Sequence, residues 1–365
     1  ITPTVLTENA ETKGDYGNVQ VYFATQTSRD ITAQTTWTTN CANNVVTVPA
    51  KGTADVTVTV KLSDALRKEL TDTFENGIYI EGYITLTQQT TAEGVTGCDL
   101  SIPYLAFYGD WDQAPVIDIG YYWQKLQGEP NWASQYLNYG GSMLSGTGSF
   151  YVFGGNPYAP ELAYYPEHNT LSPLRTDGYY DKVDLIYTAL LRNAKSLTYR
   201  ITDAKTGETY YRKTVDYVGK SVYNANYDTI LPAGSFTSTA IDPWYGVDSA
   251  GEMLKDDTTV IVSIDAELDH DGFTAAQNKN AHWEFPVTID NTPPQILSST
   301  SDGETLTLEV ADSRYLAYVE VYDVEHMNVF SEPVFSQGYS SKTPGETATV
   351  RVNVSSLNKV YVCLA

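Results

Sequence analysis

Short runs in which apolar and polar residues alternate recur along almost the whole chain, and they constrain its fold more than any other feature. In one run Val56, Val58, Val60 and Leu62 alternate with threonine and lysine. A period of two places the apolar side chains on one face of a β-strand. Turn residues such as Asn76-Gly77 and Asp302-Gly303 separate many of the runs, a pattern typical of antiparallel β-sandwiches. Similar runs lie at residues 19–23, 78–86, 183–187, 197–201, 260–264, 283–289, 306–310, 319–321, 350–354 and 360–364.

The composition agrees with this prediction of an all-β chain. Only 18% of the 365 residues are charged and 29 are tyrosine, and aromatic and β-branched residues suit a pleated, half-buried surface. A helical pattern stands out only at 63–74, where Leu66 and Leu70 are four apart and Ser63 is a candidate N-cap. We therefore expect tandem fibronectin-III/Ig-like sandwiches with helix confined to short pieces.

Two interruptions of the alternating pattern divide the chain. The pattern gives way to aromatic, glycine-rich sequence after Trp111, and Pro293-Pro294 stops strand pairing farther on. We expect three units at 1–115, 116–290 and 291–365, the last one truncated at its C-terminal end. The second would begin with a long aromatic-rich loop region at 116–170.

The charge balance bears on the possible partners. The chain carries 22 basic and 45 acidic side chains, a net charge of −23, which disfavours nucleic acid and anionic membrane surfaces. No run approaches the roughly 18 apolar residues of a membrane span. The first residues lack the pattern of a signal peptide, and both ends are strand-like. We expect a fragment of a longer polypeptide.

Three ordered motifs in the first unit resemble a known module. They are Val46–Gly52, Asn76–Ile84 and Ile102–Trp111. Together they are similar to the fibronectin-type-III-like domain that follows the catalytic domain in cell-envelope subtilisin-like serine proteases, the group of lactocepins and complement-cleaving peptidases. The resemblance covers nearly all of residues 1–118.

The middle of the chain resembles the next accessory domain of the same proteases. Leu171-Ser172-Pro173, the turn Asp177-Gly178 and the stretch Arg192–Leu197 carry this likeness. In the family a Ser-Pro-Asn-Gly-Asp-Gly turn precedes the strand, and here Leu174–Thr176 replaces part of it. The resemblance implies a polypeptide with an upstream catalytic domain, outside the cell in the bacterial envelope.

The catalytic motifs of subtilisins are absent from this sequence. Gly140-Gly141-Ser142-Met143 is superficially similar to the nucleophile motif, but Leu144 follows and no partner motif exists. None of the four histidines, His168, His270, His282 and His326, lies in a recognised nucleophile context. Alternation places His282 and Trp283 on opposite faces, which predicts a surface histidine. We expect no catalytic residues and no cofactor in this chain.

Acidic turns are candidates for a weakly held calcium ion. Asp269 and Asp271 flank His270 before Gly272, and Asp177, Asp181 and Asp184 form a second cluster. Hard cations require several oxygens on a tight turn. The alternative is a solvated acidic turn without a metal. No cysteine and histidine spacing indicates zinc.

Three interpretations fit the aromatic residues at 121–165. Trp123 and Trp132 are candidates for stacking on a glycan, as in a glycan-binding array. The same side chains can instead pack the core of an irregular region, or form a contact surface for a catalytic domain.

Three cysteines are too few for a disulfide scaffold. Cys41 precedes the strand-forming stretch Val45–Val48, and Cys98 precedes the predicted strand at 100–107. A Cys41–Cys98 disulfide is one possibility and two buried free thiols are the other. Cys363 is expected to be unpaired, on the face opposite Val362 and Leu364.

These observations predict a non-catalytic accessory region that orients a subtilisin-like protease and contributes to the access of protein substrates. The alternative is a surface adhesin or glycan-binding array, which would have the same fold.

Overall fold

A computed structural model describes residues 1–16, 19–74, 76–89, 97–118, 165–174, 181–183, 188, 190–224, 229–231, 242–270, 272, 278, 281–328 and 331–365. The chain divides into two compact units, Ile1–Ala114 and Pro115–Ala365. Almost all regular structure is antiparallel strand, so the predicted all-β class is confirmed.

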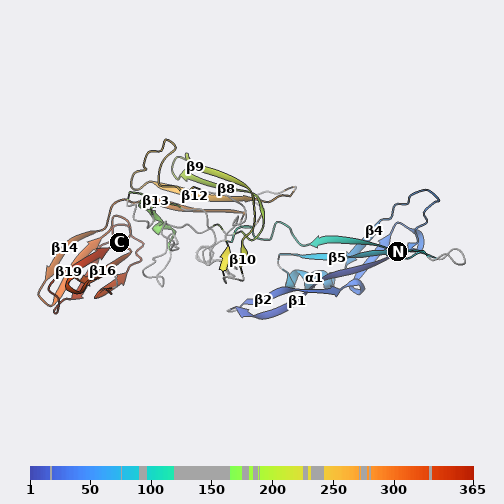
Figure 1. Ribbon diagram of the computed structural model, residues 1–365, viewed down its shortest axis with the longest axis horizontal. Coiled ribbons are helices and arrows are strands. Elements are labelled where there is room, and N and C mark those ends of the chain that lie inside the picture. The colour runs from blue at the N-terminus through green and yellow to red at the C-terminus, as the bar shows by residue number, and fades with distance from the viewer. Residues whose placement is uncertain are drawn as a thin grey trace. The chain divides into compact units, whose positions relative to one another are not determined.

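The first unit is built on a four-stranded sheet (Figure 1). Its order is β2-β1-β5-β6, and every neighbouring pair is antiparallel. A separate two-stranded sheet pairs β3 with β4. The strands are β1 (Thr2–Tyr16), β2 (Val19–Asp30), β3 (Thr35–Thr39), β4 (Val58–Leu62), β5 (Ile78–Leu86) and β6 (Leu100–Tyr108), with short 3-10 turns η1 (Thr32–Gln34) and η2 (Ala42–Asn44).

The predicted helix connects β4 to β5. Helix α1 (Asp64–Thr73) is the only α-helix in the described part of the chain. It begins where predicted, because the Ser63 hydroxyl accepts a hydrogen bond from the Leu66 backbone N–H at 3.2 Å. Leu66 and Leu70 lie on one face of the helix and pack into a small core with Val5, Ile31, Ile78 and Ile80.

Among the strands that the structure describes, β6 lies at an edge of this sheet and pairs with β5 alone. Leu100, Ile102 and Leu105 on this strand are exposed. Pro103 pairs with Tyr83 of β5 in the middle of the strand. Proline has no N–H, and it is accepted in sheets on edge strands, where that position faces solvent.

The second unit contains a five-stranded sheet in the order β7-β13-β12-β8-β9. Its strands are antiparallel except for the short parallel pair β7–β13. They are β7 (Thr170–Leu171), β8 (Ala194–Asp203), β9 (Thr209–Val218), β12 (Thr259–Glu267) and β13 (His282–Ile289). A hairpin of β10 (Val222–Asn224) and β11 (Thr229–Leu231) and the 3-10 turn η3 (Pro166–His168) belong to the same unit.

Period-two alternation accounts for the core of this sheet. Val262 of β12 lies between Ile201 of β8 and Phe285 of β13, and Ile264 lies between Tyr199 and Trp283. All six side chains are buried, because residues paired across antiparallel strands project from the same face.

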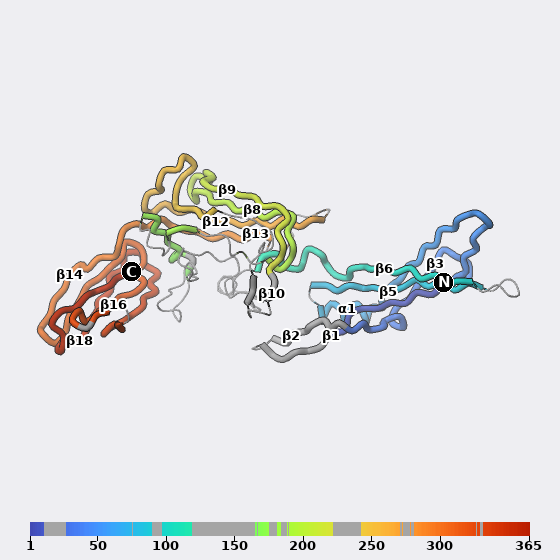
Figure 2. The backbone as a smooth tube through the Cα atoms, in the orientation of Figure 1, coloured from blue at the N-terminus to red at the C-terminus, as the bar shows by residue number. Residues whose placement is uncertain are grey.

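The C-terminal part of this unit has a separate core between two three-stranded sheets (Figure 2). One sheet contains β14 (Gln295–Ser301), β15 (Thr305–Ala311) and β18 (Ala348–Asn353). The other contains β16 (Tyr318–Asp323), β17 (Phe335–Gly338) and β19 (Val360–Leu364), with η4 (Val324–His326) after β16. We call this part the terminal sandwich, and the five-stranded part the central sandwich. The predicted three-unit limits, 1–115, 116–290 and 291–365, stay predictions.

One strand prediction is wrong. Val45–Val48 was expected to form a strand, but this stretch has no regular structure, and Val45 and Val48 are exposed. Asn43 and Asn44 just before it adopt φ values of 52° and 58°, which bend the backbone out of the extended conformation.

Candidate functional site

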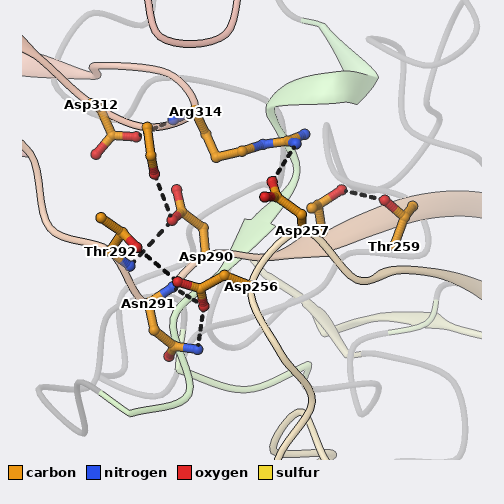
Figure 3. A network of polar contacts seen from close by, with 10 residues as sticks. Asp256, Asp257, Thr259, Asp290, Asn291, Thr292, Asp312 and Arg314 are labelled. Atoms are coloured by element: carbon orange, nitrogen blue, oxygen red, sulfur yellow. Dashed lines mark hydrogen bonds and ion pairs between the residues drawn. The ribbon is translucent and has the colours of Figure 1, made fainter.

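A network of polar contacts lies at the junction between the central and terminal sandwiches (Figure 3). The segment Asp290–Pro294 leads from β13 into β14. A turn at Asp256–Thr258, just before β12, lies on one side of this segment. A turn at Asp312–Tyr315, just after β15, lies on the other (Figure 3). We call these residues the junction.

Asp256 fixes the connecting segment to the central sandwich. Its carboxylate accepts hydrogen bonds from the backbone N–H and the Nδ2 of Asn291, both at 2.9 Å, and from the Thr292 hydroxyl at 2.7 Å. Burial works against ionisation of Asp256, but the three bonds outweigh it and lower the pKa of this carboxyl. A short acidic side chain therefore sets the direction in which the chain leaves β13.

Arg314 connects the terminal sandwich to the central one. Its Nη1 lies 3.2 Å from Oδ1 of Asp257, and only 20% of its side chain is exposed. Its guanidinium carbon lies 5.6 Å from the centre of the Tyr315 ring. Asp257 is 78% exposed, so the ion pair contributes less than about 1 kcal/mol. The planar guanidinium of Arg314 fixes the orientation of the two turns, and the ion pair adds little to their stability.

Two acidic residues, Asp290 and Asp312, lie on either side of the junction (Figure 3). Asp290 accepts hydrogen bonds from the Ser313 hydroxyl at 3.1 Å and from the Thr292 N–H at 3.3 Å. Asp312 is buried and accepts a hydrogen bond from the Arg314 N–H at 2.7 Å. Burial, followed by the charge of Asp312, raises the pKa of Asp290 to about 6, and burial also raises the pKa of Asp312.

A second contact joins the sandwiches through His168 on η3. Its Nε2 hydrogen-bonds the carbonyl oxygen of Ser341. The imidazole ring lies 4.3 Å from the ring of Tyr315 and 5.0 Å from that of Tyr165. Burial lowers the pKa of His168, although the bond to Ser341 opposes the shift. A neutral imidazole packed between aromatic rings is a structural contact.

The His282 side chain is at the surface, as predicted. His282 is exposed and contacts Asp265 at 2.7 Å and Glu284 at 3.3 Å, whereas Trp283 beside it is buried. In the described part of the chain, the hydrogen bonds identified for His168 and His282 do not reach a serine or cysteine side chain. The side chain of His326 lies outside the described residues.

The candidate cation and glycan residues are only partly described. Asp269 is exposed and Asp181 is half-buried, while Asp271, Asp177, Trp123 and Trp132 lie outside the described residues. The described side chains include no group of three or more His, Cys, Asp or Glu arranged to hold a metal ion. The calcium and glycan hypotheses therefore stay predictions.

The three cysteines are free thiols in the structure. Cys98 is exposed and Cys41 is half-buried, so the Cys41–Cys98 disulfide is not formed, and the alternative of two buried thiols is not met either. The argument for the bridge placed Cys41 at the entry of a strand, and Val45–Val48 is not a strand. Cys363 lies 3.5 Å from the Tyr318 hydroxyl, while Val362 and Leu364 pack toward the core.

Sequence reasoning identified only part of the junction. It recognised Asp290–Pro294 as a connecting segment but assigned no role to Asp256, Asp312 or Arg314. The available indication was the stretch Ala311-Asp312-Ser313-Arg314, in which an aspartate directly after a strand begins a turn. Asp290, to which the Ser313 hydroxyl donates from 23 residues away in sequence, could not be inferred from local pattern.

No helix in the described part of the chain is both long and apolar enough to cross a membrane. This agrees with the absence of a long apolar run in the sequence.

Comparison with known proteins supports the resemblance found in the motifs. Residues 3–105 match the family model of an Fn3-like domain. The chain is 23% identical to a C5a peptidase of Streptococcus pyogenes serotype M1 over 319 residues, which covers 72% of this chain and 25% of that protein. It is 23% identical to the PI-type proteinase of Lactococcus lactis subsp. cremoris over 291 residues, which covers 74% of this chain and 13% of that protein.

The chain thus spans a quarter or less of the length of these relatives. Its first unit contains an Fn3-like domain, and most of the chain is homologous at low identity to C5a peptidase and to lactococcal proteinases.

Proposed function

We propose that this chain is the non-catalytic accessory region of a secreted subtilisin-family serine endopeptidase of the bacterial cell envelope. The observation that carries the proposal is the similarity to two kinds of peptidase over about three quarters of the chain, with an Fn3-like domain at residues 3–105. The chain itself contains none of the subtilisin catalytic motifs.

In this proposal the chain positions the peptidase domain and takes no part in the cleavage reaction. Sandwiches with separate cores serve as rigid bodies, and the contacts between them decide how precisely they are oriented. The network around Asp256, Asp290 and Arg314 restricts the connection between the central and terminal sandwiches. A peptidase domain carried by the same polypeptide would be held at a defined place, where the sandwiches also limit the approach of protein substrates.

The experiment compares two substrates of the full-length polypeptide. A Gly-Ser insertion between Thr292 and Pro293 separates the sandwiches while leaving the sequence of each intact. We expect kcat/KM for a short peptide to stay within twofold of the parent protein, and kcat/KM for a folded protein substrate to change by tenfold or more. An insertion of equal length in the exposed turn at Lys205–Gly207 is the matched control.

Equal effects on both substrates, or none on either, would contradict an orienting role. A second measurement tests the absence of chemistry. The purified 365-residue chain is expected to leave casein intact, and cleavage that a serine-protease inhibitor blocks would refute the proposal.

A further inference from the structure

Three loops of the terminal sandwich enclose a cleft of about 470 Å³. Residues 314–316 follow β15, residues 339–343 follow β17, and residues 346–349 include the start of β18. Binding sites for small molecules have volumes of about 300 to 1,000 Å³. Loops held by a rigid sandwich are a common place for such sites, so the cleft has the size and the position of a ligand site.

Hydrogen bonds between and within these loops fix the walls of the cleft. The Gly345 backbone N–H donates to the carbonyl oxygen of Arg314 at 2.9 Å, which ties this stretch to the first loop. The Ser341 hydroxyl accepts from the Thr343 N–H at 3.0 Å and donates to the Glu346 carboxylate. Because these walls are set before a ligand arrives, binding does not have to order them.

Charged and hydroxyl side chains make up the polar lining of the cleft. Arg314 and Lys342 can only donate hydrogen bonds, and the ionised Glu346 can only accept them. Thr343 and Thr347 are exposed, and their hydroxyls can do both. In the part of the chain that the structure describes, no hydrogen bond of these two hydroxyls or of the Lys342 ammonium is identified. These groups are therefore available to a ligand.

Aromatic rings supply the apolar part of the lining. Tyr315 and Tyr339 line the cleft and are only partly buried. The centre of the His168 ring lies 4.3 Å from that of Tyr315 and supports it on one side. Nζ of Lys342 lies 4.6 Å from the centre of the Tyr165 ring, a cation–π contact that holds this side chain beside the cleft. Each contact fixes a lining side chain and leaves part of its surface for a ligand.

This combination fits a sugar ring better than it fits a simple ion or a purely apolar molecule. A pyranose has apolar C–H faces, which pack on aromatic rings, and a rim of hydroxyls that each donate and accept. The charges in the lining are balanced, because Arg314 pairs with Asp257 and Glu346 offsets Lys342. In a chain with a net charge of −23, an uncharged sugar is favoured over an acidic one.

We propose that this cleft is a binding site for a neutral oligosaccharide, with the two tyrosine rings against a sugar face and with Lys342, Glu346 and Thr347 at its hydroxyls. The proposal goes beyond the proposed function, because it assigns a ligand to the terminal sandwich and holds whatever activity the longer polypeptide has. The site is separate from Trp123 and Trp132, the glycan candidates of the sequence.

Saturation-transfer difference NMR on the 365-residue chain tests the proposal. The probes are the neutral oligosaccharides maltotriose, cellotriose, mannotriose and chitotriose, together with the acidic trigalacturonic acid. We expect saturation transfer to at least one neutral probe, strongest at the protons of the ring faces that meet the tyrosines. Transfer to trigalacturonic acid should be weaker. Titration of the strongest neutral probe then gives a dissociation constant for each variant.

Lys342→Ala and Thr347→Trp are the decisive variants. Both positions are exposed, and neither belongs to the core of the terminal sandwich, so both proteins should fold. Lys342→Ala removes one donor and should weaken binding about fivefold. Thr347→Trp places a large side chain in the cleft and should abolish binding.

Lys359→Ala is the matched control, because Lys359 is an exposed lysine of the same sandwich outside the cleft. Its affinity should stay within twofold of the unmodified chain, and so should that of Trp123→Ala. The proposal is overturned if no neutral probe binds, if trigalacturonic acid binds more tightly than every neutral probe, or if binding survives in Thr347→Trp. Loss of binding in Trp123→Ala, with full binding in Lys342→Ala, overturns it as well.

Discussion

The core of the first unit is small enough that one leucine should decide its stability. Leu70 of α1 is 2% exposed and is one of six buried apolar residues in this core. Leu70→Ala leaves a cavity that the four-stranded sheet and the helix cannot close without moving. Such substitutions cost from about 2.7 to 5.0 kcal/mol, and we expect about 3 kcal/mol here.

Differential scanning calorimetry measures this cost for each unit. Because the two units have separate cores, we expect separate transitions. For a domain of about 114 residues, 3 kcal/mol corresponds to a decrease in Tm of roughly 12 °C, at about 4 °C per kcal/mol. The transition of Pro115–Ala365 should not move.

Two variants serve as controls for Leu70→Ala. Lys68→Ala changes an exposed residue of the same helix and should cost less than about 0.5 kcal/mol, through loss of its pair with Asp72. Val262→Ala removes a buried side chain from the central sandwich and should shift only the transition of the second unit. The reasoning fails if Leu70→Ala costs under 1 kcal/mol or shifts both transitions equally.

Three further outcomes are expected. Ser63→Ala should lower the free energy of unfolding of the first unit by about 1 kcal/mol in urea, since it removes the cap of α1, and Ser63→Asp should retain most of it. Tyr199→Phe should lower the free energy of unfolding by about 1 kcal/mol, because the buried Tyr199 hydroxyl donates to Thr188 Oγ1 at 3.0 Å. A double-mutant cycle with Thr188→Val should show coupling between the two residues. Strictly additive costs would contradict the hydrogen bond. Thiol titration of the denatured, unreduced chain should find three thiols, and a single thiol would show that Cys41 and Cys98 are paired after all.

Local patterns predicted the strands and the helix where one face is buried and the other exposed. Val262 and Ile264 alternate with less buried neighbours in β12, and Leu66 and Leu70 mark the inner face of α1. Strand β1 was predicted only as strand-like sequence at the start of the chain, without its extent, because most of its residues are polar and no alternating run marks it. It is held between β2 and β5 by backbone pairing, a non-local contact that leaves little trace in its own sequence.

Val45–Val48 is the opposite case, because a strand was predicted there and none forms. Its valines favour an extended strand, but the left-handed conformations of Asn43 and Asn44 precede it, and the described structure gives it no strand partner. Propensity alone cannot supply a partner strand. The same limit applies to the junction, because the Ser313 hydroxyl reaches Asp290 only after two sandwiches have formed.

The edge position of β6 among the described strands bears on how the first unit can be handled in solution. An open row of backbone groups flanked by Leu100, Ile102 and Leu105 is a template on which a second copy could stack. Pro103 breaks that row, since an incoming strand finds no donor there. Replacing Pro103 with threonine would restore the donor without adding apolar surface. The altered protein would then be prone to form fibrils at high concentration, which Pro103 prevents.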